Sequence, residues 1–372
     1  MIDYFESING VEKLTDSYNP ATWILEVIGA GVGKSGAKTT DFVELFKSSV
    51  HCERLQSTLN REGVSRPSPS LPALAYSDKR AASELAQMTF LLQRFANMYW
   101  RTSSYNLTRF GISLVLGLVF GMTYIDAEYT SYSGINSGLG MLYLAMAFLG
   151  LVSFNSMLPV AAEGRTVFYR ERAAQTYNAF WYFFGSSVLE IPYVFASVLL
   201  FMAVFFFVVG FTGVDAFATM FLALVLHVLL QGYLGELLVF LTPNLEVAQI
   251  VGMQISLTFF LYMGFSPPAE KLSSGTKWVY DMTPLTYAFA IIATAVFGDC
   301  PSDGDTSNTG CKQMTNVPPS LADGITVEEY LSTKFLMKHD EILRNFGILI
   351  GIVLLVRALT LLTMRFINYQ KK

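Results

Sequence analysis

The chain has 372 residues, of which 52% are hydrophobic and 15% are charged, and its mean hydropathy is +0.43. Soluble domains usually carry ~25% charged residues, so this composition excludes an ordinary soluble protein and indicates an integral membrane protein. The net charge of −4 favours neither nucleic acid as a partner nor a strongly basic membrane-surface patch.

The N-terminal part, residues 1–82, is polar and mixed, and we interpret it as a cytosolic segment that ends in a linker. Pro and Ser crowd the stretch from Ser65 to Pro72, as in linkers. Gly29–Ser35 is similar to a phosphate-binding loop, but Ile28 occupies the position of the first required glycine, so we expect no nucleotide site. The chain opens without a secretory signal, so we expect the first apolar span to insert and the N-terminus to stay cytosolic.

Residues 83–101 predict an amphipathic helix in the cytoplasmic interface, with Arg94 and Arg101 toward the lipid headgroups. An ordinary soluble helix is the alternative. The apolar positions recur at a spacing of three to four residues: Leu85, Met88, Leu92, Phe95 and Tyr99.

Six apolar stretches predict six transmembrane helices, since ~20 apolar residues cross a bilayer. They are 106–126, 136–160, 188–210, 216–241, 247–266 and 345–366. Arginines in the connection 163–187 place it in the cytosol under the positive-inside rule, which also places both termini there. The fold class is an all-α membrane protein. Residues 106–266 hold spans one to five, 267–344 form one large external loop, and 345–372 hold span six and a cytosolic tail.

Cys300 and Cys311 fall in the expected external loop, where an oxidising environment allows a disulfide between them, and Cys52 is expected to be a free thiol. The histidine and cysteine spacing predicts no metal site, and no catalytic constellation stands out. We interpret His227 as a helix-packing residue rather than a proton relay.

Charges inside the expected spans require an explanation, because each costs ~2.5–3.5 kcal/mol on insertion scales. We expect Arg357 to pair with Glu190 or Glu236, which could lie at a similar depth. The alternative is that Arg357 extends to the interface instead.

Four motifs together carry a resemblance to a known family: Asn19–Val27 (NPATWILEV), Phe168–Ala173 (FYRERA), Glu190–Tyr193 (EIPY) and Met282–Ala288 (MTPLTYA). In order and spacing the chain from Tyr4 onward resembles the C-terminal half of full-size pleiotropic-drug-resistance ABC transporters of the G subfamily, beginning after the ATPase core. The resemblance implies an ABC-2, G-type exporter of hydrophobic or amphipathic drugs, xenobiotics or lipids in the plasma membrane.

The same resemblance implies partners that the chain does not contain. No Walker A, Walker B or signature motif is present, so we expect no ATP hydrolysis by this chain alone and no cofactor in it. ATP and magnesium would bind nucleotide-binding domains outside it. The N-terminal half of the transporter would complete the cavity, and membrane lipid would surround the spans.

Coupling to those domains is expected at residues 163–172, where charged side chains flank an aromatic pair that could anchor a partner surface. The set is Glu163, Arg165, Phe168, Tyr169, Arg170, Glu171 and Arg172. The alternative is that these arginines only fix the topology.

The substrate cavity is expected between the second and fifth spans, which line it in similar transporters, with Phe265 as an outer plug. The expected lining is Met141, Phe148, Val152, Asn155, Met253, Leu257, Phe260 and Gly264. Lipid contact or helix packing is the alternative for each. For the whole protein, the alternatives are a nucleotide-independent carrier or channel and a non-transporting scaffold subunit.

Overall fold

The computed structural model describes residues 1–30, 41–61, 63–65, 80, 82–125, 127–300, 308–319, 321 and 324–369. The chain divides into two compact units, Met1–Ser77 and Asp78–Lys372, and each is described by itself. Within the described ranges all regular elements are helices, apart from two isolated bridges between single residues.

The first unit contains four short helices: α1 (Ile2–Glu6), α2 (Pro20–Val27), α3 (Phe42–Lys47) and α4 (Val50–Leu59). Asn19 begins α2 by accepting a hydrogen bond from the Ala21 amide, and Trp23 on α2 is buried. Cys52 is buried and free. The glycine-rich stretch from residue 31 and the linker from residue 66 lie outside the described residues.

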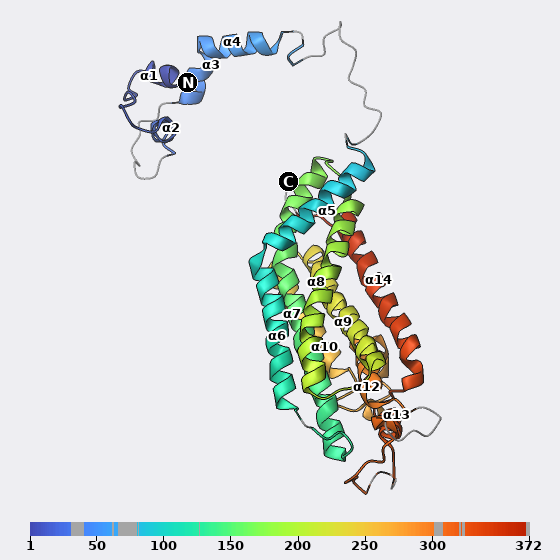
Figure 1. The fold of residues 1–372 in the computed structure, drawn as a ribbon. Coiled ribbons are helices and arrows are strands. Elements are labelled where there is room, and N and C mark those ends of the chain that lie inside the picture. Colours follow the sequence, from blue (N-terminus) through green and yellow to red (C-terminus); the bar gives the residue numbers. More distant parts are fainter. Residues whose placement is uncertain are drawn as a thin grey trace. The chain divides into compact units, whose positions relative to one another are not determined.

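The second unit is a helical bundle (Figure 1). Its helices are α5 (Glu84–Arg101), α6 (Ser103–Thr123), α7 (Tyr132–Ala173), α8 (Ala179–Val208), α9 (Val214–Leu241), α10 (Leu245–Leu261), α11 (Lys277–Met282), α12 (Pro284–Phe297), α13 (Val327–Lys334) and α14 (Ile342–Phe366). Short 3-10 helices cover Ala269–Lys271, Thr309–Cys311 and His339–Glu341. Helix α5 lies at one end of the bundle and α13 at the other, and we name these the α5 end and the α13 end.

Five helices of the described chain are long and apolar enough to cross a membrane: Tyr105–Thr123, α7, α8, α9 and His339–Phe366. The fifth expected span, 247–266, is shorter in the structure, because α10 ends at Leu261 after 17 residues. Gly264 follows with a φ of +92°, a left-handed conformation that a continuing helix does not adopt. At 1.5 Å per residue α10 extends about 26 Å.

The expected cytosolic loop at 163–187 is not a loop. Helix α7 continues without a break to Ala173, and its 42 residues extend about 63 Å, twice the thickness of the hydrocarbon core. Helix α8 begins at Ala179, where the Asn178 side chain accepts from the Phe180 amide. Glu and Arg are good helix formers, so the charges that mark the membrane boundary do not end the helix.

The expected external loop at 267–344 also needs correction, because it contains a core helix. Twelve of the fourteen residues of α12 are buried, and α12 packs against α9 and α14. A helix that is apolar on all sides is stable only when it is surrounded. Helices α11 and α13 and the 3-10 helices Thr309–Cys311 and His339–Glu341 contact α12, which joins them to the bundle.

Helix α5 forms as expected, and its buried face coincides with the predicted apolar positions at Phe95 and Tyr99. Toward its N-terminus the buried residues are Gln87 and Leu91, whereas Leu85 is 68% exposed. Phe95 packs on Tyr182 of α8 with ring centroids 4.9 Å apart. This close packing ties the α5 end of the bundle together.

Candidate functional site

The arginines near the end of α7 bind the ends of other helices. The Arg165 guanidinium donates to the carbonyl of Val239 and, at 2.7 and 3.1 Å, to those of Thr242 and Pro243, where α9 ends. The last carbonyls of a helix lack partners within it and carry partial negative charge. A guanidinium satisfies several of them at once, so Arg165 ties α7 to α9.

Arg172 makes the same kind of contact with α14. Its guanidinium donates to the carbonyls of Met364 at 2.7 Å and Arg365 at 2.6 Å, which lie in the last turn of that helix. Two helices far apart in sequence therefore end on side chains of α7.

Glu171 joins α7 to α5. Both of its oxygens accept from Nη1 of Arg94, at 2.8 and 2.9 Å, and Oε2 also accepts from the Tyr177 hydroxyl at 2.7 Å. Burial, together with the hydrogen bond to Glu171, raises the pKa of Tyr177, so this hydroxyl remains a donor. We call Arg165, Glu171 and Arg172, with these partners, the α7 junction.

The aromatic pair of the expected coupling segment lies inside the bundle. Phe168 is 0% and Tyr169 4% exposed, and Phe168 packs on Tyr182 and Phe240 with ring centroids 4.6 and 5.7 Å apart. The expectation that this pair anchors a partner surface is therefore wrong. Because α7 continues as a helix, every third or fourth side chain turns toward the bundle.

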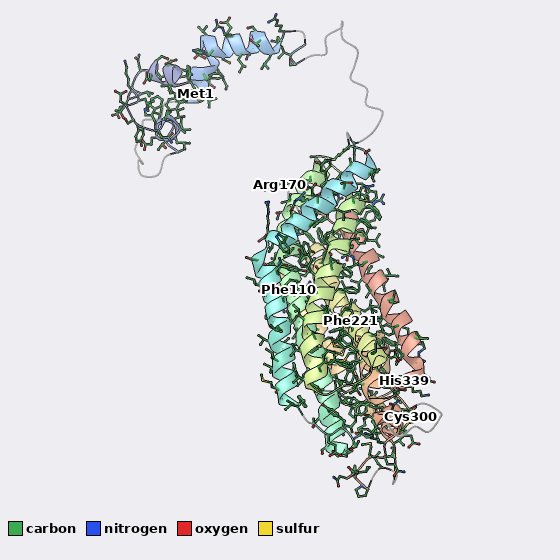
Figure 2. All side chains as sticks on the ribbon, viewed as in Figure 1. Met1, Phe110, Arg170, Phe221, Cys300 and His339 are labelled. Carbon is green, nitrogen blue, oxygen red and sulfur yellow. A yellow bond between two sulfur atoms is a disulfide. The ribbon has the colours of Figure 1, made fainter. Side chains whose placement is uncertain are left out.

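Glu163 and Arg170 are the exposed members of the expected coupling set. Arg170 lies at the α5 end of the bundle (Figure 2). The other charged residues of the set, Arg165, Glu171 and Arg172, contact this chain's own helices, so the segment is an internal junction as much as an external surface.

A buried network that the sequence interpretation missed centres on Arg109 of α6. Its Nη1 pairs with Glu190 Oε1 of α8 at 2.5 Å, and its Nη2 donates to Ser153 Oγ of α7 at 2.7 Å. Tyr105 donates to Glu190 Oε2 at 2.5 Å. The sequence contains the signal for this network, because Arg109 is a charged residue inside the expected first span. Like Arg357, it needs a partner of opposite charge there.

Arg357 of α14 is paired with Glu236 of α9, one of the two partners expected for it. Glu190, the other expected partner, forms its ion pair with Arg109 instead. The Arg357 guanidinium also donates to the Ser187 hydroxyl and lies 4.5 and 4.3 Å from the ring centroids of Phe183 and Tyr233. At 6% exposure it does not extend to an interface.

A groove of about 400 Å³ lies between α6 and α7, toward the α5 end. Phe148, Val152 and Asn155, expected as cavity residues, line it. The other described lining residues are Thr102, Tyr105, Thr108, Ile112, Leu151, Ser156, Pro159, Val160 and Glu163. Met141 does not belong to the groove, because it is 0% exposed in the core.

The expected residues of the fifth span lie elsewhere. Met253 and Leu257 are 58% and 57% exposed on α10 and do not line this groove. Phe260 packs edge-on against Tyr143 of α7. Phe265 packs among aromatic rings of its own bundle, with centroids 5.3 Å from Tyr143 and 6.2 Å from Phe289 and from Phe335.

The disulfide joins Cys300 to Cys311, with Cα atoms 4.9 Å apart, near the α13 end (Figure 2). His227 is buried, with Nε2 2.9 Å from the Met146 carbonyl oxygen. Within the described residues no group of three or more His, Cys, Asp or Glu side chains is arranged to hold a metal ion.

Comparison with known families decides what this bundle is. Residues 86–297 match the ABC-2 type transporter family, and residues 300–372 match the CDR ABC transporter family. The chain belongs to the ABC-2 type transporters. The ABC-2 match covers nearly all of α5 and extends through α12, so it contains the groove, the Arg109–Glu190 pair and the α7 residues of the junction. The contacts on α14, including Arg357, lie in the second match.

Named relatives agree with this membership. The chain is 30% identical over 375 residues to pleiotropic drug resistance protein 1 of Petunia hybrida, covering 100% of the chain and 24% of that protein. It is 31% identical to ABC transporter G family member 36 of Oryza sativa subsp. indica, over 91% of the chain and 22% of that protein. For member 40 of Arabidopsis thaliana the identity is 31%, over 84% of the chain and 22% of that protein. The chain thus spans about a quarter of these relatives, and the resemblance to pleiotropic-drug-resistance transporters is confirmed.

Proposed function

We propose that this ABC-2 domain moves hydrophobic or amphipathic compounds out across the plasma membrane, driven by ATP in nucleotide-binding domains outside the chain. Magnesium would accompany ATP there, and a second membrane half would complete the cavity. Supporting this, the relatives are named as ABC transporters and pleiotropic drug resistance proteins. The α5 end would face the cytosol, because the arginines of α7 gather there.

One observation carries the proposal: a single continuous helix, α7, includes both the groove residues and the junction. A helix transmits an axial or tilting displacement along its length because its backbone hydrogen bonds resist stretching. Displacing the junction would move the groove wall formed by Phe148, Val152 and Asn155. The same displacement would act on α9 through Arg165 and on α14 through Arg172.

The exposed side chains at this end, Glu163 and Arg170, are the ones available to a nucleotide-binding domain. Arg165, Glu171 and Arg172 would pass the motion on rather than receive it. This division replaces the original expectation that all seven residues of the segment meet the partner directly.

The test is vanadate-sensitive efflux of a hydrophobic dye from cells that produce the chain joined to its nucleotide-binding domains and second membrane half. In the Arg165→Ala/Arg172→Ala variant we expect the rate of efflux to fall about fivefold or more, which corresponds to the lower end of usual coupling free energies. The amount of transporter at the cell surface should be normal. Arg344→Ala is the matched control, since Arg344 forms an exposed pair with Glu341 where α14 begins.

Unchanged efflux by the double variant at normal surface level would contradict coupling through the junction. Vanadate-insensitive movement of the dye by the chain alone would favour a carrier or channel. A scaffold subunit would be indicated if Phe148→Ala and Asn155→Ala left efflux by the whole assembly unchanged.

A further inference from the structure

The groove between α6 and α7 has its charged group at one end and apolar side chains at the other. Among the described residues that line it, Glu163 is the one charged side chain, and it is exposed near the α5 end. Apolar side chains, including Ile112, Phe148 and Val152, form the wall farther along the bundle. About 22 Å of helix axis separates Phe148 from Glu163, at 1.5 Å per residue.

Three of the four hydroxyl groups along the described groove have already used their hydrogens. Thr102 Oγ1 donates to the Met98 carbonyl at 2.7 Å, and Ser156 Oγ donates to the Ser153 carbonyl at 3.0 Å. Tyr105 donates to Glu190. A hydroxyl has a single hydrogen and two lone pairs, so these three oxygens can offer a ligand only acceptor sites.

The buried guanidinium of Arg109 does not offer hydrogen-bond donors to a ligand in the groove. Arg109 is 1% exposed, and its terminal nitrogens are held by Glu190, Tyr105 and Ser153. An anion in the groove would therefore meet the Glu163 carboxylate and these oxygen lone pairs, with only the neutral Thr108 hydroxyl and Asn155 amide as donors. A cation at the Glu163 end would meet the carboxylate and these oxygens as favourable partners, with the apolar side chain of Val160 one helical turn from Glu163.

We propose that the groove selects hydrophobic cations, with the Glu163 carboxylate as the group that recognises the positive charge. The inference rests on the transport function proposed above and names the substrate class of the same groove. Glu163 thereby acts as a specificity-determining residue in addition to being an exposed side chain near the junction. The apolar wall contributes binding without charge preference.

The probes are tetraphenylphosphonium and tetraphenylborate, which have the same four phenyl rings and opposite charge. Equilibrium binding of each to the full chain in lipid nanodiscs is measured, with empty nanodiscs subtracted. In Glu163→Gln we expect tetraphenylphosphonium to bind about three- to fivefold more weakly, as for an ion pair partly open to solvent. Tetraphenylborate binding should not weaken.

The matched control is Glu246→Gln, which removes an exposed carboxylate from the first turn of α10 without touching the groove. It should change neither probe's affinity. A loss of tetraphenylphosphonium binding equal to that in Glu163→Gln would show a general surface-charge effect and overturn the inference.

Val160→Ala separates this inference from the proposed function. Val160 lines the groove one helical turn from Glu163, and we expect the variant to weaken both probes, about threefold each, because it removes apolar surface from the wall. If Val160→Ala has that effect while Glu163→Gln changes neither probe, or weakens both equally, the groove binds hydrophobic ions but charge selection by Glu163 is wrong. If Val160→Ala changes neither probe, the groove is not the binding site and both proposals fail.

Discussion

The two ends of the bundle are held together by different chemistry. At the α5 end, Arg165 and Arg172 of α7 donate to the last carbonyls of α9 and α14, and Glu171 accepts from Arg94 of α5. At the α13 end, the Cys300–Cys311 disulfide and a set of packed aromatic rings around Phe265 hold the chain together.

This difference matters for a transporter. Charged hydrogen bonds at a partly exposed site can exchange with water, so the polar contacts of the junction can rearrange although the aromatic rings beside them are close-packed. A disulfide does not exchange in this way. The structure therefore suits an exchangeable junction at the α5 end and a covalently closed α13 end, and three changes would test that contrast.

The largest effect is expected for Arg357→Ala, inside the bundle. Removing one partner of a buried ion pair leaves Glu236 uncompensated, which typically costs about 3–5 kcal/mol in the free energy of unfolding. Thermal unfolding of the purified chain in detergent measures the loss. Replacing both partners, as in Arg357→Met/Glu236→Leu, should recover much of it, whereas strictly additive losses would contradict a direct pairing.

The second effect concerns the α13 end. Cys300→Ser/Cys311→Ser removes a bridge that closes a short loop, for which a loss of about 2–3 kcal/mol is usual. We expect lower thermal stability, measured under non-reducing conditions, with retained binding of hydrophobic ions in the groove. The free thiol variant Cys52→Ser is the control. Equal loss of stability and groove binding would show that the two ends are not independent.

The smallest effect is expected for Arg94→Ala at the junction. The Arg94–Glu171 pair is partly exposed, and such pairs contribute about 0.2–1 kcal/mol. Thermal stability should hardly change, and the change should shrink further at high salt. A loss larger than that of the disulfide variant would reverse the proposed contrast between the exchangeable junction and the covalently closed end.

Much of the architecture was predictable because the bilayer imposes it. The helices α6, α7, α8, α9 and α14 follow from runs of apolar residues that need to cross ~30 Å of hydrocarbon. Their ends were less predictable: the long helix α7 passes through the expected membrane boundary at Glu163, since a change in polarity does not end a helix.

The residues of the candidate site could be recognised from the sequence, but the residues that they contact could not. Arg357 was recognisable as a costly intramembrane charge, and Glu236 and Glu190 as possible partners. The choice between them depended on Arg109, which occupies Glu190. Likewise, the charged and aromatic residues at 163–172 were recognisable, but only the helical phase of α7 turned Phe168 and Tyr169 inward.

The sequence by itself determined the class of protein, the approximate spans, the cysteine pair and the family, because composition, segment length and local motifs are properties of neighbouring residues. The tertiary structure decided that α12 lies in the core, that the arginines of α7 bind the ends of α9 and α14, and that α6 and α7 leave a groove beside Glu163. These features join residues far apart along the chain, and their contacts depend on which helix faces which, information that local patterns do not contain.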